Sequence, residues 1–412
     1  MRISKLAISE NENTARLSAT VSHEALEKSE QDIYFEVGIQ HKNYLRAFYE
    51  PFILACFPAA LLHGEKRISV EGAACPELIS NIKSAMLLQK RWWKDKNTLP
   101  IIEYKNNRIL DLAPHGTAGF MSGGVDSLSS YCRNISLYTL KDPRRIRHAI
   151  FVYGLDVGDP NKMERKDIFE EGKNKLVSFL ERNGCELIPV YTNARNIEPD
   201  WRFYEERHFG ALLSGIAHAL SGKFSHCQLA LDSRADFADE WGSHPWLNNY
   251  VSSSGLVINS TMDAYSRLER YSFLAQKPES LETLRVCYMM NNIPTGEINC
   301  GKCSKCTRTK VELLSHGLLN DAKTFSDKSI SPDLLRGLIV RHPHEVEYVG
   351  EPIKRLREIG ENEIADHLEE QIKKYNSGPN IKDRTINLLK SFDAKFLNGF
   401  LKTTLNRREK NP

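Results

Sequence analysis

Residues 120–133 read Phe-Met-Ser-Gly-Gly-Val-Asp-Ser-Leu-Ser-Ser-Tyr-Cys-Arg. An apolar run at 117–121 leads into the small turn Ser122-Gly123-Gly124, and an amphipathic segment follows it. This order predicts a strand, a turn and a helix. Because glycines adopt backbone angles that other residues rarely reach, consecutive N–H groups can point into one concavity, and the helix start adds positive potential. The stretch therefore predicts a phosphate-binding turn.

The stretch differs from the other common phosphate loop, Gly-x-x-x-x-Gly-Lys-[Ser/Thr]. The nearest approach to that loop, residues 215–224, has the wrong spacing and no hydroxyl after Lys223. A glycine-rich turn without any ligand is the other interpretation. The full pattern Ser-Gly-Gly-x-Asp-Ser, placed between a strand and a helix, favours the phosphate-binding one.

The region around this turn, residues 113–319, alternates strands and helices. Helices are expected at 127–140, 162–182 and 205–220, and strands at 117–121, 149–154, 185–191 and 228–231. Such alternation predicts the α/β class, with a parallel sheet, helices on both faces and ligands at the carboxyl ends of the strands. Asp156, after the second strand, is placed either to accept a ribose hydroxyl or to cap a turn.

The flanking regions differ in character from this centre. Residues 1–112 predict an N-terminal α+β domain of unknown role, with strands at 2–9, 15–21 and 32–38, a buried helix at 44–63 broken or kinked at Pro58, and a helix at 75–93. Trp92 and Trp93 favour packing between domains over stacking on a base. Residues 320–412 predict a helical extension, with a surface helix pair at 353–359 and 363–375. A basic amphipathic tail from Ile386 favours docking on its own domain over a lipid, nucleic-acid or protein partner.

The composition limits the classes of protein to which the chain can belong. The chain has 412 residues, of which 41% are hydrophobic and 26% charged, and its net charge is +3. Such a chain is typical of a globular protein of two or three domains, and the charge does not indicate a polyanionic partner. No apolar stretch typical of a secretion signal follows Met1, and the longest apolar run, 52–62, is about half a membrane span. We therefore expect a cytoplasmic protein without a membrane span.

The cysteines predict a metal site. Cys300, Cys303 and Cys306 stand at two-residue gaps, and Cys287 lies upstream with twelve residues between it and Cys300. Four thiolates at such spacing suit a structural Zn²⁺ ion, with a redox Cys-x-x-Cys or an iron–sulfur cluster as alternatives. The five other cysteines are expected in the core.

The pattern Ser-Gly-Gly-x-Asp-Ser resembles the signature of the PP-loop ATP pyrophosphatases, which have an adenine nucleotide alpha hydrolase-like fold and cut ATP between its α and β phosphates. The resemblance implies that Ser122, Gly123, Gly124 and Ser127 hold pyrophosphate and that Asp126 lies near Mg²⁺. It implies an ATP site made of Phe120, Met121, Ser122, Gly123, Gly124, Val125, Asp126, Ser127, Tyr153, Gly154 and Asp156.

The same turn followed by four cysteines resembles 7-cyano-7-deazaguanine synthases, over about residues 117–310. Tyr153-Gly154, Arg207 at the head of a helix, and Cys-Gly-x-Cys-x-x-Cys carry the likeness. Those enzymes adenylate 7-carboxy-7-deazaguanine, let ammonia displace AMP, and dehydrate the amide to a nitrile with a second ATP; zinc fastens the segment that closes their active site. Long proteins of this layout resemble those of bacterial anti-phage defence operons, which implies an amine of a partner protein as the acceptor.

A loop of carboxylates and aromatics at 232–245 is the expected substrate pocket, because a guanine-like edge offers N–H donors and its faces favour stacking. The expected pocket residues are Arg207, Asp232, Asp236, Phe237, Asp239, Glu240, Trp241 and His244. Asp239 or Glu240 pairing with Arg234 or Arg207 is the alternative. The expected catalytic residues are Ser122, Asp126, Ser127, Arg207 and His208. His208 stands where the synthases have Asn, and a structural hydrogen bond is favoured there over a proton acceptor.

The leading hypothesis is an ATP-dependent carbon–nitrogen ligase that joins the deazapurine acyl group to an amine of a partner protein. The alternatives are a nitrile synthase that feeds queuosine biosynthesis or DNA modification, a PP-loop enzyme that modifies tRNA, and a catalytically silent, zinc-stabilised scaffold. The expected cofactors are ATP, Mg²⁺ and Zn²⁺. The departures from the synthase pattern are His208, the longer gap between Cys287 and Cys300, and the long terminal segments.

Overall fold

The computed structural model describes residues 1–27, 30–109, 116–158, 164–232, 234, 240–340 and 343–378. The chain divides into two compact units, residues 1–330 and residues 331–412. The first unit holds the sheet and every predicted site residue that is described. The second unit is helical where it is described.

One ten-stranded sheet organises the first unit, in the order β12-β11-β8-β9-β10-β3-β2-β1-β4-β6. Its parallel half consists of β8 (Thr117–Phe120), β9 (Ile146–Tyr153), β10 (Glu186–Thr192), β11 (His226–Ala230) and β12 (Val257–Thr261). The other half consists of β1 (Arg2–Glu10), β2 (Thr14–Ser22), β3 (Gln31–Gly38), β4 (Arg67–Val70) and β6 (Ile101–Glu103). β5 (Ala73–Ala74) and β7 (Asn106–Asn107) form a separate small pair. The expected α/β class with a mostly parallel sheet is confirmed.

The two halves of the sheet join where β3 runs antiparallel to β10, with Phe35 opposite Thr192. The strands of residues 1–112 therefore extend the sheet of residues 113–319, and both segments contribute to one hydrophobic core. The expected boundary near residue 112 lies inside a single compact unit. An exposed strand edge that finds a partner satisfies its N–H and C=O groups, which is the physical reason for such a join.

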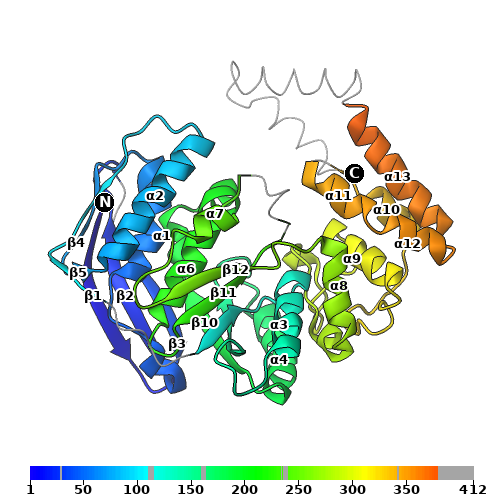
Figure 1. The fold of residues 1–412 in the computed structure, drawn as a ribbon, viewed down its shortest axis with the longest axis horizontal. Coiled ribbons are helices and arrows are strands. Elements are labelled where there is room, and N and C mark those ends of the chain that lie inside the picture. Colours follow the sequence, from blue (N-terminus) through cyan, green and yellow to red (C-terminus); the bar gives the residue numbers. More distant parts are fainter. Residues whose placement is uncertain are drawn as a thin grey trace. The chain divides into compact units, whose positions relative to one another are not determined.

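Two cores lie on opposite faces of the parallel strands. In β9, Ile150 belongs to one core while its neighbours Ala149 and Phe151 belong to the other, as the two-residue period of a strand requires. The first core contains α1 (Glu50–Leu62), α2 (Pro76–Trp92) and α6 (Phe209–Ala219). The second contains α3 (Val125–Leu137), α4 (Lys166–Arg182), α8 (Arg267–Ala275) and α9 (Ser304–Ser315). Figure 1 shows these two groups of helices.

Of the expected break or kink at Pro58, the break is absent, because α1 runs through Pro58 to Leu62. A proline inside a helix costs about 3 kcal/mol, since it removes a hydrogen bond and crowds the preceding turn. Every residue of α1 from Glu50 to Leu61 is buried, and α1 packs against α2 and α6. Burial on all sides offsets the cost of the proline, so the helix stays continuous.

Short elements complete the first unit. They are η1 (Ile39–Tyr44), η2 (Ala194–Ile197), α5 (Trp201–Phe203), the π-helical turn η3 (Tyr204–His208), α7 (Pro245–Asn248), η4 (Pro278–Thr283) and η5 (Met290–Asn292). The expected helix at 205–220 is therefore a π-turn followed by α6. Single π-turns are rare and often occur at functional sites, because they displace side chains from their helical positions.

The second unit contains α10 (Pro332–Arg336), α11 (Pro343–Gly350), α12 (Ile353–Glu358) and α13 (Asn362–Asn376). The expected helix pair at 353–359 and 363–375 corresponds to α12 and α13, which pack through Leu356, Ala365 and Leu368. The expected basic tail from residue 386 lies outside the described residues.

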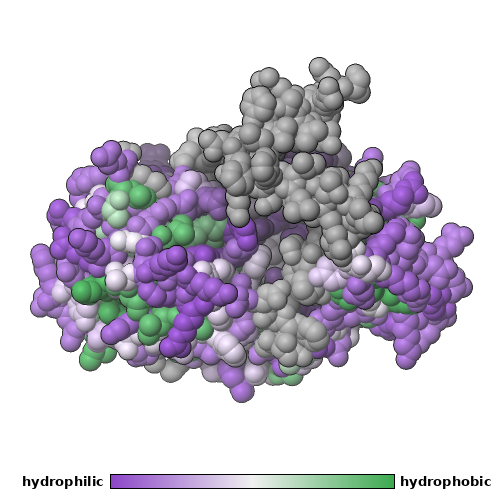
Figure 2. All heavy atoms as spheres, turned by 90° about the horizontal axis from the view of Figure 1, so that it is seen from above, coloured by the Kyte–Doolittle hydropathy of each residue, from purple (hydrophilic) through white to green (hydrophobic). Residues whose placement is uncertain are grey.

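The described surface is mostly hydrophilic on the face that Figure 2 shows, with small apolar patches. Among the described helices, none combines the length and the apolar character that crossing a lipid bilayer requires.

Candidate functional site

The expected strand–turn–helix around the glycines is present. β8 ends at Phe120, the Met121 amide donates to the Ile150 carbonyl at 2.8 Å, and α3 begins at Val125. Gly123 has φ +77°, and a Cβ added there would lie 3.2 Å from the Thr283 carbonyl oxygen. A side chain at this position is therefore disfavoured both by backbone strain and by contact with residues 283–285.

The two serines of the turn hold its backbone. The Ser122 hydroxyl accepts from the Gly124 amide at 3.2 Å, and the Ser127 hydroxyl accepts from the Ser122 amide at 3.2 Å and donates to the Gly124 carbonyl at 3.1 Å. Ser122 is exposed while Ser127 is buried. These amides at a helix start are the donors that an anion would take over from the hydroxyls.

The enclosed space behind the turn is too small for a nucleotide. The cavity lined by Gly119, Met121, Ser127 and Ser130 measures about 10 Å³, which is room for one water molecule.

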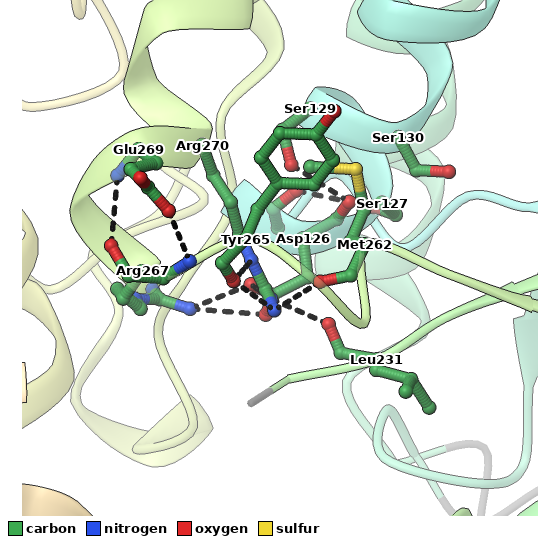
Figure 3. A network of polar contacts seen from close by, with 12 residues as sticks. Asp126, Ser127, Ser129, Ser130, Leu231, Met262, Tyr265, Arg267, Glu269 and Arg270 are labelled. Carbon is green, nitrogen blue, oxygen red and sulfur yellow. Dashed lines mark hydrogen bonds and ion pairs between the residues drawn. The ribbon is translucent and has the colours of Figure 1, made fainter. Parts of the chain in front are cut away.

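Asp126 connects this turn to two buried arginines, as Figure 3 shows. Arg267 Nη1 donates to both carboxylate oxygens of Asp126, at 2.9 and 3.0 Å, and Arg270 Nη1 donates to one of them at 2.6 Å. Burial alone would raise the pKa of this carboxyl, but the two arginines outweigh it and hold the pKa below its usual value. Asp126 therefore holds two cations, and its expected contact with Mg²⁺ stays a prediction.

Arg270 ties the turn to the carboxyl ends of two further strands. Its guanidinium donates to the carbonyls of Leu231, after β11, and of Met262, after β12, and it is fully buried. Its helix, α8, starts with a capping box in which Ser266 and Glu269 bond each other's backbone amides. The arginine is therefore fixed at both its backbone and its side chain (Figure 3).

A second carboxylate, Glu312 on α9, completes the charged cluster. It accepts from Arg267 Nε at 3.3 Å and from the Tyr271 hydroxyl at 2.6 Å, and it lies 3.5 Å from Arg308 Nε. Among the described residues, three arginines thus meet two carboxylates in this cluster beside the glycine turn.

The turn after β9 borders the same edge of the sheet. Asp156 is exposed, and one of its oxygens accepts from the Tyr204 hydroxyl at 2.7 Å. Tyr153 is buried and its hydroxyl donates to the Glu164 carbonyl at 2.8 Å, while Gly154 has φ +105°. The carboxyl ends of β8, β9 and β11 therefore gather Ser122, Asp156 and Asp232, as the parallel topology requires.

Arg207 is bound by residues of the N-terminal segment. Its Nη1 donates to both oxygens of Asp95 at 3.0 Å, and its guanidinium lies 4.7 Å from the ring centre of Trp93. The Arg207 carbonyl accepts from Gln89 Nε2 at 2.9 Å. The end of α2 thus fixes the predicted substrate-binding arginine from outside the central region.

An aromatic group lies next to this arginine. Trp92 is nearly parallel to Trp246, with ring centres 6.4 Å apart, and His244 lies between 5.0 and 5.2 Å from both. Trp246 is 61% exposed, whereas His244 is buried. The expected packing of Trp92 against a distant segment is present, and it encloses His244, one of the predicted pocket residues.

His208 is a core residue. It is fully buried, its Nε2 lies 2.6 Å from the Ala55 carbonyl of α1, and burial lowers its pKa to about 4. The structure therefore does not bring its side chain to the carboxyl edge of the sheet, and we leave His208 out of the proposed chemistry. Its placement fits the structural hydrogen bond that the sequence favours.

The rest of the expected pocket is described only in part. Asp236, Phe237 and Asp239 lie outside the described residues, Asp232 and Glu240 are exposed, and Trp241 is half-buried. Gly242 lies against the backbone of the π-turn, where an added Cβ would be 3.0 Å from the Arg207 carbonyl carbon. This close approach anchors the end of the loop beside Arg207.

The four expected metal ligands come together. The Sγ atoms of Cys287, Cys300, Cys303 and Cys306 all lie within 4.8 Å of one another. Cys287 and Cys303 are 3.8 Å apart, and Cys300 and Cys306 are 3.9 Å apart. A tetrahedral ion with Zn–S bonds of about 2.3 Å would place sulfurs about 3.8 Å from each other, so the group fits a metal such as zinc. Hydrogen bonds from Cys287 and Cys306 lower the pKa of the Cys303 thiol, which favours the thiolate.

The four-cysteine group lies close in sequence to residues that contact the glycine turn or belong to the charged cluster beside it. Cys303 immediately precedes α9, which carries Arg308 and Glu312, and Cys287 lies two residues after Arg285. The five remaining cysteines are buried, as expected: Cys56, Cys75, Cys132, Cys185 and Cys227.

Sequence reasoning missed several residues that the structure brings to the site, namely Asp95, Arg267, Arg270, Arg285 and Glu312. The one available signal was the spacing of Arg267 and Arg270, three residues apart after a capping box, which places both on one helix face. Comparisons with protein-family models, with curated proteins and with solved structures found no match to this chain.

Proposed function

We propose that the protein uses ATP to activate a carboxylic acid, releases pyrophosphate, and transfers the acyl group to an amine. The observation that carries the proposal is the glycine turn between β8 and α3, at the carboxyl edge of parallel strands and beside the buried arginines Arg267 and Arg270. Amide donors, a helix start and buried guanidinium groups stabilise the charge that develops on a leaving phosphate.

In the proposed first step, a carboxylate oxygen attacks the α-phosphorus of ATP. The bond from that phosphorus to the oxygen that bridges the α and β phosphates breaks, and pyrophosphate leaves. In the second step the amine nitrogen attacks the acyl carbon, the carbon–oxygen bond to AMP breaks, and the proton of the amine passes to solvent. Such chemistry depends on positioning and electrostatics more than on an acid–base residue.

The likeness to deazaguanine synthases makes 7-carboxy-7-deazaguanine the first acid to test and a partner-protein amine the first acceptor. Mg²⁺ would bind mainly to the phosphates, because the Asp126 oxygens already accept from Arg267 and Arg270. The four-cysteine group would hold zinc as a structural ion, with no open position for chemistry.

The decisive assay is the formation of AMP and pyrophosphate from ATP with this acid, in the parent and in Ser122→Ala. Loss of a hydrogen bond to a charged group costs about 1.5–3 kcal/mol, so kcat/KM should fall about 10- to 150-fold. Ser136→Ala is the matched control, because Ser136 lies near the far end of α3, the helix that follows the turn, and its hydroxyl donates to the Cys132 carbonyl. Its kcat/KM should stay within twofold of the parent.

Mass spectrometry of the products separates the acceptors. A partner protein with added deazapurine mass supports the ligase, whereas a free nitrile made with ammonia shows a synthase. If the parent protein forms no AMP with any tested carboxylic acid, the proposal is rejected.

A further inference from the structure

Arg285 lies across the glycine turn without taking part in the charged cluster around Asp126. The backbone amide of Arg285 donates to the Gly123 carbonyl at 2.8 Å, and its side-chain Nε donates to the Ser122 carbonyl at 3.2 Å. Arg285 is 9% exposed, and its Cδ atom lies close to Gly172 of α4. The guanidinium is therefore held between the turn and the helix that follows β9.

The charge of this guanidinium has no counter-ion within the described part of the chain. No ion pair joins Arg285 to a carboxylate there, and the residue is buried. An unpaired charge nine-tenths removed from water is costly unless something compensates it. A bound anion at the turn would supply that compensation.

The segment that carries Arg285 is fastened by the metal group. The Asn299 side chain is buried; its Oδ1 accepts from the amides of Val286 and Cys287 at 2.9 and 3.2 Å, and its Nδ2 donates to the Leu284 carbonyl at 2.8 Å. Asn299 itself immediately precedes Cys300. A metal ion bound to Cys287 and Cys300 would hold residues 284–287 next to Asn299, the residue to which they are hydrogen-bonded. Residues 284–287 would then be fixed against the turn.

We propose that Arg285 binds a phosphate group of the nucleotide and that the four-cysteine metal site holds it in place to do so. This inference deepens the proposed function and rests on it. Arginine suits the task because its planar guanidinium can donate to phosphate oxygens while Nε stays bonded to the turn. The metal site is then a positioning device for an anion site, in addition to its role in stability.

The test measures pyrophosphate binding by calorimetry, using the full-length zinc-loaded protein and inorganic pyrophosphate as the probe. Arg285→Ala should weaken pyrophosphate binding at least tenfold. Arg285→Lys should bind with an affinity between those of the parent and Arg285→Ala, because lysine keeps the positive charge but lacks the planar pair of N–H donors. Arg144→Ala is the charge-matched control: Arg144 is exposed, pairs with Asp142, and should leave the affinity within twofold.

The second arm removes the metal with a chelator. In the parent protein the affinity for pyrophosphate should fall as far as it does in Arg285→Ala, whereas in Arg285→Ala itself it should fall by less than threefold. Such non-additivity shows that the metal acts through the arginine. Asn299→Ala should raise hydrogen exchange at residues 284–287 and weaken pyrophosphate binding while the zinc content stays at one ion per chain.

The outcomes separate this inference from the proposed function. If folded Arg285→Ala binds pyrophosphate like the parent while Ser122→Ala does not, Arg285 is no phosphate ligand and the proposed function stands. If chelation weakens the parent and Arg285→Ala equally, the metal does not act through Arg285. If the parent binds neither pyrophosphate nor ATP, both the inference and the proposed function fail.

Discussion

Replacing Asp126 with alanine should lower the free energy of unfolding of the first unit by about 3 kcal/mol. The change removes the only carboxylate that Arg270 contacts among the described residues, and it removes one of the two carboxylates, Asp126 and Glu312, that pair with Arg267 there. Arg270 is fully buried, and Arg267 is 7% exposed. Removing one partner of a buried ion pair costs about 3–5 kcal/mol, because the other charge stays buried.

The lower end of that range applies because the Asp126 side chain is 25% exposed, so water can enter once it is removed. At about 2 °C per kcal/mol for a unit of this size, the melting temperature should fall by about 6 °C. Tryptophan fluorescence in a urea titration is the suitable assay. All five tryptophans lie within residues 1–330, so the signal reports the first unit.

Asp167→Ala is the matched control. Asp126 and Asp167 are each the second residue of a helix, so their interaction with the helix dipole is similar. Asp167 also pairs with an arginine, at 3.0 Å, but its side chain is 61% exposed. A surface pair is worth about 0–1 kcal/mol. If the two variants lose the same stability to within about 1 kcal/mol, the assignment of a buried charge cluster is refuted.

The pH dependence provides a second check on the same reasoning. The arginines lower the pKa of Asp126 in the folded protein below the value of about 3.9 expected when unfolded. The contribution of Asp126 is therefore fully present above about pH 4 and is lost as pH falls further. The stability difference between the parent and Asp126→Ala should be constant from pH 5 to 8 and shrink below about pH 4.

Three further predictions follow from buried groups. Burial lowers the pKa of both His208 and His218 to about 4, so stability should fall by up to about 2.7 kcal/mol per pH unit as pH drops from about 6.5 towards 4; thermal melts across that range measure it. Asp95→Ala leaves the largely buried Arg207 without its ion partner and should cost about 2 kcal/mol in urea unfolding. Cys303→Ser should abolish stoichiometric zinc, measured by atomic absorption.

Each of these predictions has a contrasting variant. His218→Gln removes one of the two titrating histidines and should halve the dependence of the free energy of unfolding on pH between about 6.5 and 4. Glu171→Ala breaks a surface pair with Lys175 on α4 and should cost less than about 0.5 kcal/mol, in contrast to Asp95→Ala. Cys185→Ser changes a buried cysteine outside the metal group and should keep the zinc. An unchanged zinc content in Cys303→Ser would contradict the four-cysteine site.

The sequence alone determined the features that depend on neighbours along the chain. The turn at 122–124 follows from two adjacent glycines between an apolar run and an amphipathic one, and α4 and β10, expected at 162–182 and 185–191 from their periodicity, lie at Lys166–Arg182 and Glu186–Thr192. The cysteine group was predictable because three ligands fall within seven residues. Local steric and hydrophobic preferences decide such features, so a short stretch contains the information.

Only the tertiary structure decided which side chains surround the turn. Asp126 meets Arg267 and Arg270 across more than 140 residues of chain, and Arg207 meets Asp95 across 112. The joining of β3 to β10, which brings the end of α2 to Arg207, is likewise a long-range pairing. The reason is physical: an ion pair or a strand pairing depends on how whole layers pack, and any arginine in the chain carries the same charge until packing selects its partner.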